Sequence, residues 1–219
     1  MKKFRFALFD VDGTLIDSMM AWKKAATDYM TQLGFGQYVT DSLLVAICQL
    51  SKTDAISYLA KKFGITEPVD TESVDLQKIL LEYYREEVGL RPGVVESLSK
   101  MKKAGVRMGI LSASYEAALR ELLGRLGILS YFEFILTSET FPEGKHSSAI
   151  FEEGLRRLGA TPEETVMFED TLYPMQTAKK MGIDIVAIQD PAEPRQDAVR
   201  AIASLYMEDG FMDPDKLPF

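Results

Sequence analysis

The sequence of 219 residues predicts an α/β protein that has a parallel-sheet core and an inserted all-helical segment. In the second half of the chain, short apolar segments alternate with segments of helical periodicity, which favours parallel strands joined by helical crossovers. Before that alternation, residues 17–89 carry only helical patterns. We therefore expect a core domain of residues 1–16 and 90–219, and a helical cap domain of residues 17–89.

The first strand is expected at Phe4–Phe9, where the apolar run FRFALF ends directly before Asp10. A helix should follow from Ser18 to about Gly34, because apolar residues recur there at steps of three and four. Three further helical patterns complete the insertion, at about Asp41–Leu50, Lys52–Phe63 and Val74–Val88.

The core resumes with a helix that begins near Pro92, since proline is tolerated in the first turn, and that ends at Gly105. The remaining elements follow in order: a strand at Val106–Leu111, a helix at Tyr115–Leu126, a strand at Phe132–Thr137, a helix at Ser147–Leu158, a strand at Thr165–Phe168, a helix at Met175–Met181, a strand at Ile183–Ile188 and a helix near Ala192–Ser204. A tail, Met207–Phe219, packs either on the core or on a neighbour.

The composition limits the partners of the chain. Its 25 basic and 33 acidic residues give a net charge of −8, which disfavours nucleic acid and anionic membranes as partners. The single cysteine, Cys48, excludes an intrachain disulfide and favours a reducing, cytoplasmic location. The apolar N-terminal run is too short for a signal peptide or a membrane span. We expect a monomer.

Residues with acid, hydroxyl and amine groups follow the predicted strands. Ligands of open α/β sheets bind outside the carboxyl ends of the strands, so these side chains should gather at one edge. They are Asp10 and Asp12 after the first strand, Ser112 and Ala113 after the second, Lys145 after the third, and Glu169 and Asp170 after the fourth.

Converging carboxylates repel one another unless a cation lies between them, and Mg²⁺ accepts carboxylates together with a phosphate oxygen. Lys145, the Ser112 hydroxyl and the backbone amides around Val11, Asp12 and Ala113 could then neutralise a bound phosphate. This combination is suited to phosphoryl transfer, in which positioning and charge stabilisation carry most of the catalysis.

Four segments together resemble the motifs of the haloacid dehalogenase-like superfamily. They are DVDGTLIDS at Asp10–Ser18, LSAS at Leu111–Ser114, GKHSS at Gly144–Ser148 and FEDT at Phe168–Thr171, and their order and spacing match. The resemblance covers nearly the whole chain and implies a Rossmann-like core. The insertion resembles the helical cap of the subgroup that contains phosphoglycolate phosphatase and β-phosphoglucomutase.

The resemblance implies a role for each motif residue. Asp10 would be the nucleophile and a metal ligand, and Asp12 would be the general acid/base with its backbone carbonyl on the metal. The remaining roles are as follows: Ser112 and Lys145 would hold the phosphoryl group, Asp170 would bind Mg²⁺ with Glu169 assisting directly or through water, Gly13 would allow the turn, and Thr14 would brace the loop. Because a halide needs no proton to leave, Asp12 favours phosphate esters over haloacids.

The predicted function is a Mg²⁺-dependent phosphatase that acts on a small phosphorylated metabolite through an aspartyl phosphate. A β-phosphoglucomutase-like mutase is disfavoured, because the segment MMAWKKA after the first motif lacks the histidine that such mutases usually carry. A non-catalytic phosphometabolite-binding protein is disfavoured because every catalytic position is filled.

Several details stay open at this point. Met19 and Trp22 would either line the substrate pocket or pack within the helix. His146, the only histidine, either touches substrate or has no function. In the fourth motif, EDTLYPMQTAKKMG, Pro174 replaces the usual glycine and the bulky Tyr173 precedes it. Two short hinges, near Leu15–Ser18 and Gly89–Pro92, would let the cap close.

Overall fold

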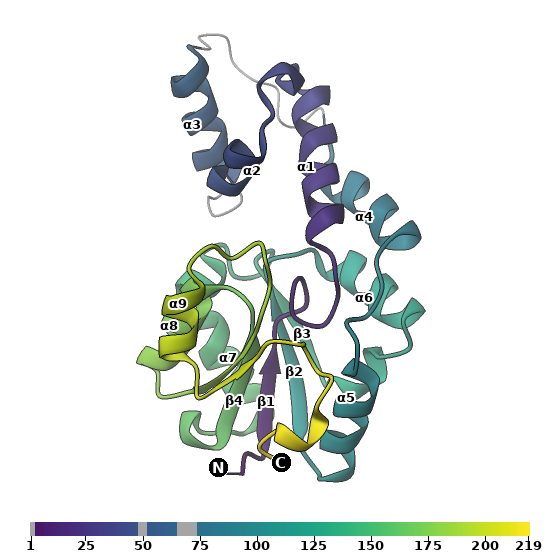
Figure 1. The fold of residues 1–219 in the computed structure, drawn as a ribbon, viewed down its shortest axis with the longest axis vertical. Helices are drawn as coiled ribbons and strands as arrows, with labels where there is room; N and C mark the ends of the chain where they lie inside the picture. Colours follow the sequence, from purple (N-terminus) through teal and green to yellow (C-terminus); the bar gives the residue numbers. More distant parts are fainter. Residues whose placement is uncertain (1–2, 48–51, 65–73) are drawn as a thin grey trace. The chain divides into compact units, whose positions relative to one another are not determined.

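The computed structural model describes residues 3–47, 52–64 and 74–219 (Figure 1). Cys48, which we expect to be buried because it lies in the apolar run VAICQL, is outside these residues. The chain divides into two compact units, one formed by Met1–Ser18 with Val88–Phe219 and the other by Met19–Glu87.

The first unit contains a six-stranded parallel sheet, which confirms the predicted α/β class. Its strand order is β3-β2-β1-β4-β5-β6, so β1 lies at the centre and its carboxyl end is flanked by those of β2 and β4. The strands are β1 (Phe6–Phe9), β2 (Arg107–Ser112), β3 (Ile135–Thr137), β4 (Thr165–Glu169), β5 (Asp184–Ile188) and β6 (Leu205–Met207).

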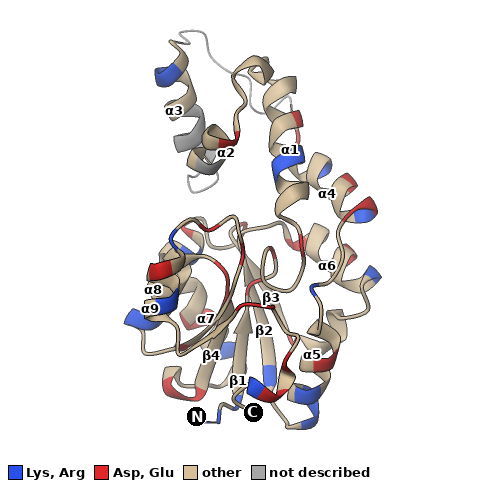
Figure 2. Ribbon diagram, viewed as in Figure 1, with Lys and Arg blue, Asp and Glu red and all other residues tan. Residues whose placement is uncertain are grey.

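Helices cover both faces of this sheet, as right-handed crossovers require (Figure 1). One face carries α5 (Val94–Lys103) and α6 (Glu116–Arg125), and the other carries α7 (Ala149–Leu158), α8 (Leu172–Lys180) and α9 (Gln196–Ile202). Short 3₁₀ turns lie in the connections at Leu129–Tyr131, Gly144–His146 and Pro162–Glu164, and another lies in the C-terminal segment at Pro214–Lys216. Figure 2 shows acidic and basic residues together on α5.

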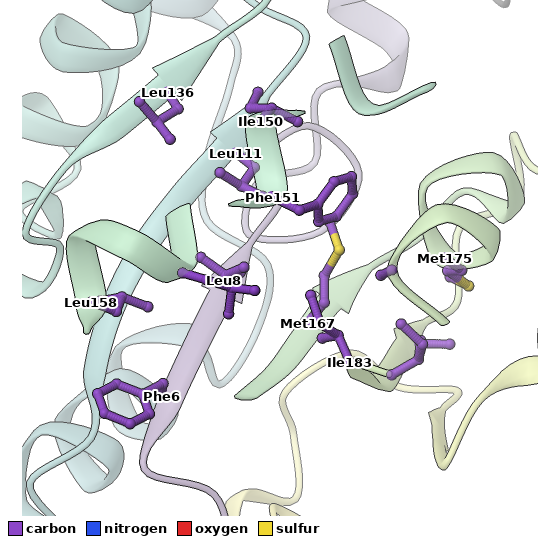
Figure 3. Close-up of a cluster of buried hydrophobic side chains, with 14 of the residues drawn as sticks. Phe6, Leu8, Leu111, Leu136, Ile150, Phe151, Leu158, Met167, Met175 and Ile183 are labelled. Carbon is purple, nitrogen blue, oxygen red and sulfur yellow. The ribbon is translucent and has the colours of Figure 1, made fainter. Parts of the chain in front are cut away.

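Successive side chains of β1 pack on opposite faces of the sheet. Phe6 and Leu8 belong to the cluster beneath α7 and α8 (Figure 3), which also contains Leu111, Leu136, Ile150, Phe151, Leu158, Met167, Met175 and Ile183. Gly154 allows α7 to pack closely, because a Cβ there would lie 3.2 Å from side-chain atoms of Leu8 and Leu111. Phe9, the next residue along β1 from Leu8, stacks on Phe168 with ring centroids 4.4 Å apart. Burial on both faces is typical of a central parallel strand.

The C-terminal segment packs on the core and adds a strand that was not predicted. β6 pairs with β5 in parallel, and its three residues are too few to give an alternation signal. The segment after it is held by Phe211, which is fully buried, and by Lys100, whose Nζ donates to the Pro214 carbonyl at 2.8 Å. The Phe4 N–H donates to the Pro218 carbonyl at 3.1 Å, so the two ends of the chain lie together.

Some predicted boundaries were wrong. α8 begins at Leu172 instead of Met175, because the helix tolerates Pro174 in its first turn. α9 begins at Gln196 instead of Ala192, because the Asp190 carboxylate accepts from the Ala192 N–H at 2.7 Å and holds a turn there. β1 begins at Phe6, two residues later than predicted.

The described part of the second unit is helical. It contains α1 (Met19–Gln32), a 3₁₀ turn at Gly36–Tyr38, α2 (Asp41–Ile47), α3 (Lys52–Phe63) and α4 (Leu76–Glu86). α1 and α4 are joined by a hydrogen bond from the Tyr83 hydroxyl to Asp28 Oδ2 at 2.6 Å. A small apolar cluster forms around Met30, Phe35, Leu43 and Leu59. Among the residues that the structure describes, no helix is both long and apolar enough to cross a bilayer.

Candidate active site

The loop after β1 folds back tightly on itself. The Val11 carbonyl accepts from the N–H groups of Thr14, Leu15 and Ile16 at 2.9–3.2 Å. Gly13 has a φ of 82°, and a Cβ at this position would lie 2.5 Å from Asp170 Oδ2. Glycine therefore serves both purposes here, the turn and the close approach of the loop to Asp170.

Three buried carboxylates meet at the carboxyl end of the sheet. Asp10 follows β1, Glu169 ends β4 and Asp170 follows it. Oxygens of the three groups lie within 4.8 Å of one another, and each residue is at most 4% exposed. Neighbouring parallel strands bring them together, because β1 and β4 pair in the register Phe9–Phe168. Such a group of oxygen ligands can hold a hard divalent cation.

Lys145 lies between two of these carboxylates. Its Nζ contacts Asp10 Oδ1 at 2.6 Å and Glu169 Oε2 at 2.7 Å, and the side chain is 3% exposed. The residue comes from the 3₁₀ turn Gly144–His146 after β3. Although burial opposes the charged amine, the Asp10 and Glu169 carboxylates raise the pKa of Lys145 well above its ordinary value. Lys145 is therefore a permanent cation in the site.

The negative charge of the cluster exceeds what one lysine can neutralise. Burial raises the pKa of Asp10 from 3.8 to about 8, Lys145 opposes the rise, and the charges of Glu169 and Asp12 add to it. Burial also raises the pKa of Asp170 well above its ordinary value, and the nearby carboxylates act in the same direction. A second cation would relieve this repulsion and favour the ionised acids.

Glu169 is the most completely hydrogen-bonded acid of the cluster. Its Oε1 accepts from the Thr171 hydroxyl at 2.6 Å and from the N–H groups of Thr171 and Asp170 at 3.1 and 3.2 Å. Its Oε2 accepts from Lys145. Asp170 is held by Thr14, whose Oγ1 donates to Oδ1 at 2.9 Å. Glu169 is thus oriented toward Lys145, whereas Asp170 is braced by the loop after β1.

Asp12 and Ser112 lie in the adjoining loops. Asp12 is half-buried, and its Oδ1 accepts from the Ser18 hydroxyl at 2.7 Å. Ser112 is the last residue of β2, and its Oγ accepts from the Ser114 N–H at 3.0 Å. Ala113 follows it with an exposed side chain. β2 and β1 are neighbours in the register Ile110–Phe9, so both loops open at the same edge of the sheet.

Sequence reasoning found the charged groups of the cluster but missed two residues that orient them. Ser18 and Thr171 hold Asp12 and Glu169 through hydroxyl hydrogen bonds. Both were visible as hydroxyl residues at the ends of the first and fourth motifs, although no role was assigned to them. Met19 and Trp22 lie on α1, in the second unit, and their predicted place in a substrate pocket stays a prediction.

Comparisons with known proteins show what the whole chain is similar to. A family model described as haloacid dehalogenase-like hydrolase matches residues 7–188. A phosphoglycolate phosphatase from Nitrosococcus oceani is 26% identical over 196 residues, which cover 86% of this chain and 85% of that protein. A phosphorylated carbohydrates phosphatase from Thermotoga maritima is 24% identical over 181 residues, 81% of each chain. A crystal structure of CbbY from Rhodobacter sphaeroides in complex with phosphate has a TM-score of 0.79, with 21% identity and 96% coverage of both chains, and shows the same fold.

Proposed function

The chain belongs to the haloacid dehalogenase-like hydrolases, and we propose that it is a Mg²⁺-dependent phosphatase whose nucleophile is Asp10. Its substrate would be a small phosphorylated metabolite. The observation that carries the proposal is the buried group of Asp10, Glu169 and Asp170, whose oxygens lie within 4.8 Å of one another. Lys145 contacts two of these acids and adds the positive charge that a phosphoryl group requires.

In the first step, a carboxylate oxygen of Asp10 attacks phosphorus and forms an aspartyl phosphate. The bond from phosphorus to the ester oxygen breaks, and Asp12 gives its proton to the leaving alkoxide. The Ser18 hydroxyl supports this role, because its hydrogen bond to Asp12 Oδ1 fixes the orientation of the carboxyl group. Lys145, the Ser112 hydroxyl and the amides after β1 and β2 would hold the phosphoryl oxygens.

In the second step, Asp12 takes a proton from water, and the water oxygen attacks the phosphoryl group. The bond from phosphorus to Asp10 breaks, so that inorganic phosphate leaves and the Asp10 carboxylate is regenerated. Asp12 therefore ends the cycle protonated, as it began. The assignment of these roles to Asp10 and Asp12 stays a proposal that rests on their positions at the end of β1.

The carboxylate set fits a magnesium ion, because hard oxygen donors are the ligands that Mg²⁺ prefers. Asp10 and Asp170 would bind it with the backbone carbonyl of Asp12, whereas Glu169 would assist through water because both of its oxygens already accept hydrogen bonds. When bound, the ion supplies charge that favours ionised Asp10 and neutralises the phosphoryl oxygens. The cap role of residues 17–89, the monomeric state and the cytoplasmic location are also proposals, and they rest on the sequence alone.

The first test is phosphate release from a panel of small phosphate esters, measured with Mg²⁺ and with EDTA. We expect release that requires Mg²⁺ and that falls at least about 10³-fold in Asp10→Asn, because the attacking oxygen is lost. Asp17→Asn is the matched control, since Asp17 is an exposed carboxylate of the same loop. The aspartyl phosphate would be sought by mass spectrometry after acid quenching.

The outcomes distinguish a phosphatase from a mutase and from a binding protein. Phosphate release that persists in Asp10→Asn would contradict the assignment of Asp10 as the nucleophile. A hexose 1-phosphate that is converted to its isomer, with no free phosphate, would establish a mutase instead. Binding of esters without turnover would indicate a non-catalytic phosphometabolite-binding protein.

A further inference from the structure

Two aromatic rings join the loop that carries Lys145 to the helix that follows Asp170. The His146 and Tyr173 rings are stacked, with centroids 4.1 Å apart and an angle of 15° between their planes. His146 ends the 3₁₀ turn Gly144–His146, so it is the next residue after Lys145. Tyr173 is the second residue of α8 and lies three positions after Asp170.

The stack lies at the boundary between the buried charges and solvent. His146 is exposed and Tyr173 is half-buried, whereas Lys145 beside them is 3% exposed. Burial raises the pKa of the Tyr173 hydroxyl to about 12, and the charges of Lys145, Glu169, Asp10 and Asp170 also act on it. The tyrosine is therefore close enough to the acidic cluster to experience its field.

We propose that the His146–Tyr173 stack is a positioning element that holds Lys145 against Asp10 and Glu169 by bracing its turn on α8. The inference rests on the proposed phosphatase function, since the value of a fixed Lys145 is the charge it presents to a phosphoryl group. The two rings act through Lys145 and need not touch the substrate.

The turn that carries Lys145 needs such support. It is a single 3₁₀ turn, which has poorer hydrogen-bond geometry than an α-helix. Gly144 occupies the left-handed region with a φ of 53°, so the segment before Lys145 is not regular helix. Lysine also has a long side chain with many rotamers, which must be restricted to keep Nζ at 2.6 and 2.7 Å from two carboxylates. A stacked ring on the adjacent residue restricts the backbone at the base of that side chain.

Steady-state kinetics of matched variants test the proposal. In His146→Ala and Tyr173→Leu the stack is lost, and we expect kcat/KM to fall about 10- to 100-fold, the range expected for a misplaced catalytic group. His146→Phe and Tyr173→Phe keep two stacked rings and should stay within about threefold of the native chain. Glu143→Ala, an exposed residue of the same loop, is the control.

The pattern across substrates separates positioning from direct contact. Lys145 faces the phosphoryl group that every ester shares, so the loss in His146→Ala should be equal for esters with different leaving groups. A loss that depends on the leaving group would overturn the proposal and indicate that the rings touch the substrate. Activity of His146→Ala within twofold of the native chain, or a His146→Phe variant as slow as His146→Ala, would also overturn it.

Two readouts do not require turnover. His146 is the only histidine of the sequence, so its ring protons give an unambiguous NMR signal in untagged protein. Stacking on Tyr173 should shift these protons upfield, and the shift should vanish in Tyr173→Leu but persist in Tyr173→Phe. Unshifted protons in the native chain would refute the stack. With Mg²⁺ present, inorganic phosphate should bind about tenfold more weakly to His146→Ala than to His146→Phe. Displacing the preorganised charge of Lys145 weakens its contact with the anion. Equal affinities would refute the proposal that the stack positions Lys145.

These readouts distinguish the two proposals from each other. If the native chain releases no phosphate from any ester, the proposed phosphatase function fails. The NMR shift and the phosphate affinities of the variants would then still decide whether the stack positions Lys145.

Discussion

Replacing Asp10 by asparagine should stabilise the metal-free protein while it abolishes the proposed activity. The substitution removes one of three buried carboxylates that lie within 4.8 Å of one another, and it keeps the shape of the side chain. The amide oxygen of asparagine can still accept a hydrogen bond from Lys145 Nζ, which also keeps its contact with Glu169. The charge distribution of this site thus predicts that Asp10, the proposed nucleophile, lowers the stability of the metal-free protein.

The size of the effect follows from the Asp10 titration. The pKa of Asp10 rises from 3.8 in the unfolded chain to about 8 in the folded one, mainly through burial. The unfolded state therefore releases the proton first, so the contribution of Asp10 to the free energy of unfolding decreases from about pH 4 to about pH 8. At about 1.4 kcal/mol per pH unit, Asp10 lowers the stability by about 4 kcal/mol at pH 7 and by about 2 kcal/mol at pH 5. Asparagine lacks this titration.

The assay is urea unfolding in EDTA at pH 7 and pH 5, followed by circular dichroism. With a urea dependence of about 2 kcal/mol per molar, typical of a protein of this size, the Asp10→Asn midpoint should exceed that of the native chain by about 2 M at pH 7. The gain should be less than half as large at pH 5. Mg²⁺ should reduce this difference in urea midpoint, because the ion binds the ionised site of the native chain and stabilises its folded state by mass action.

Two results would refute this reasoning. One is an Asp10→Asn midpoint at pH 7 that equals or falls below that of the native chain in EDTA. The other is a gain that does not decrease between pH 7 and pH 5. The exposed Asp17 of the same loop provides the control, since Asp17→Asn should leave the midpoint unchanged at both pH values.

Two further predictions concern the brace of Asp170 and the packing of β2. Thr14→Val removes the 2.9 Å hydrogen bond to Asp170 Oδ1, so the Mg²⁺ concentration for half-maximal phosphate release should rise about tenfold while the rate at saturating Mg²⁺ changes little. An unchanged Mg²⁺ requirement would show that Thr14 does not orient a metal ligand. Gly109→Ala places a Cβ against the Phe134 ring and should lower the free energy of unfolding by about 1–3 kcal/mol in urea titrations. A urea midpoint equal to that of the native chain would mean that the Phe134 ring moves away from the added Cβ without lowering the free energy of unfolding.

Much of the first unit follows from local sequence signals. The alternation of apolar strands and periodic helices predicts a parallel sheet, because parallel neighbours must be joined by a crossover connection, which is usually a helix. The positions of Asp10, Ser112 and Glu169 at strand ends are also local properties, since each is one residue from an apolar run. Once the strands are parallel, their carboxyl ends meet at one edge, so the gathering of these side chains is predictable as well.

What the sequence could not determine depends on distances between residues far apart in the chain. Lys145 lies 135 residues from Asp10, and no local pattern states that its Nζ reaches both Asp10 and Glu169. The hydrogen bonds that both Glu169 oxygens accept depend on side-chain directions, and so does the stacking of His146 on Tyr173. The strand Leu205–Met207 was missed, and the packing of the C-terminal segment was left open between the core and a neighbour, for a related reason: short segments become ordered only through the surface on which they pack.

The sequence by itself thus determined the class of the fold and the set of chemical groups at its edge, because periodicity and strand ends are properties of neighbouring residues. Only the tertiary structure decided how those groups are paired, which of them are buried and how far the pKa of Asp10 rises. Those properties arise from desolvation and from Coulomb interactions over a few ångströms, and they exist only after the strands have brought remote residues together.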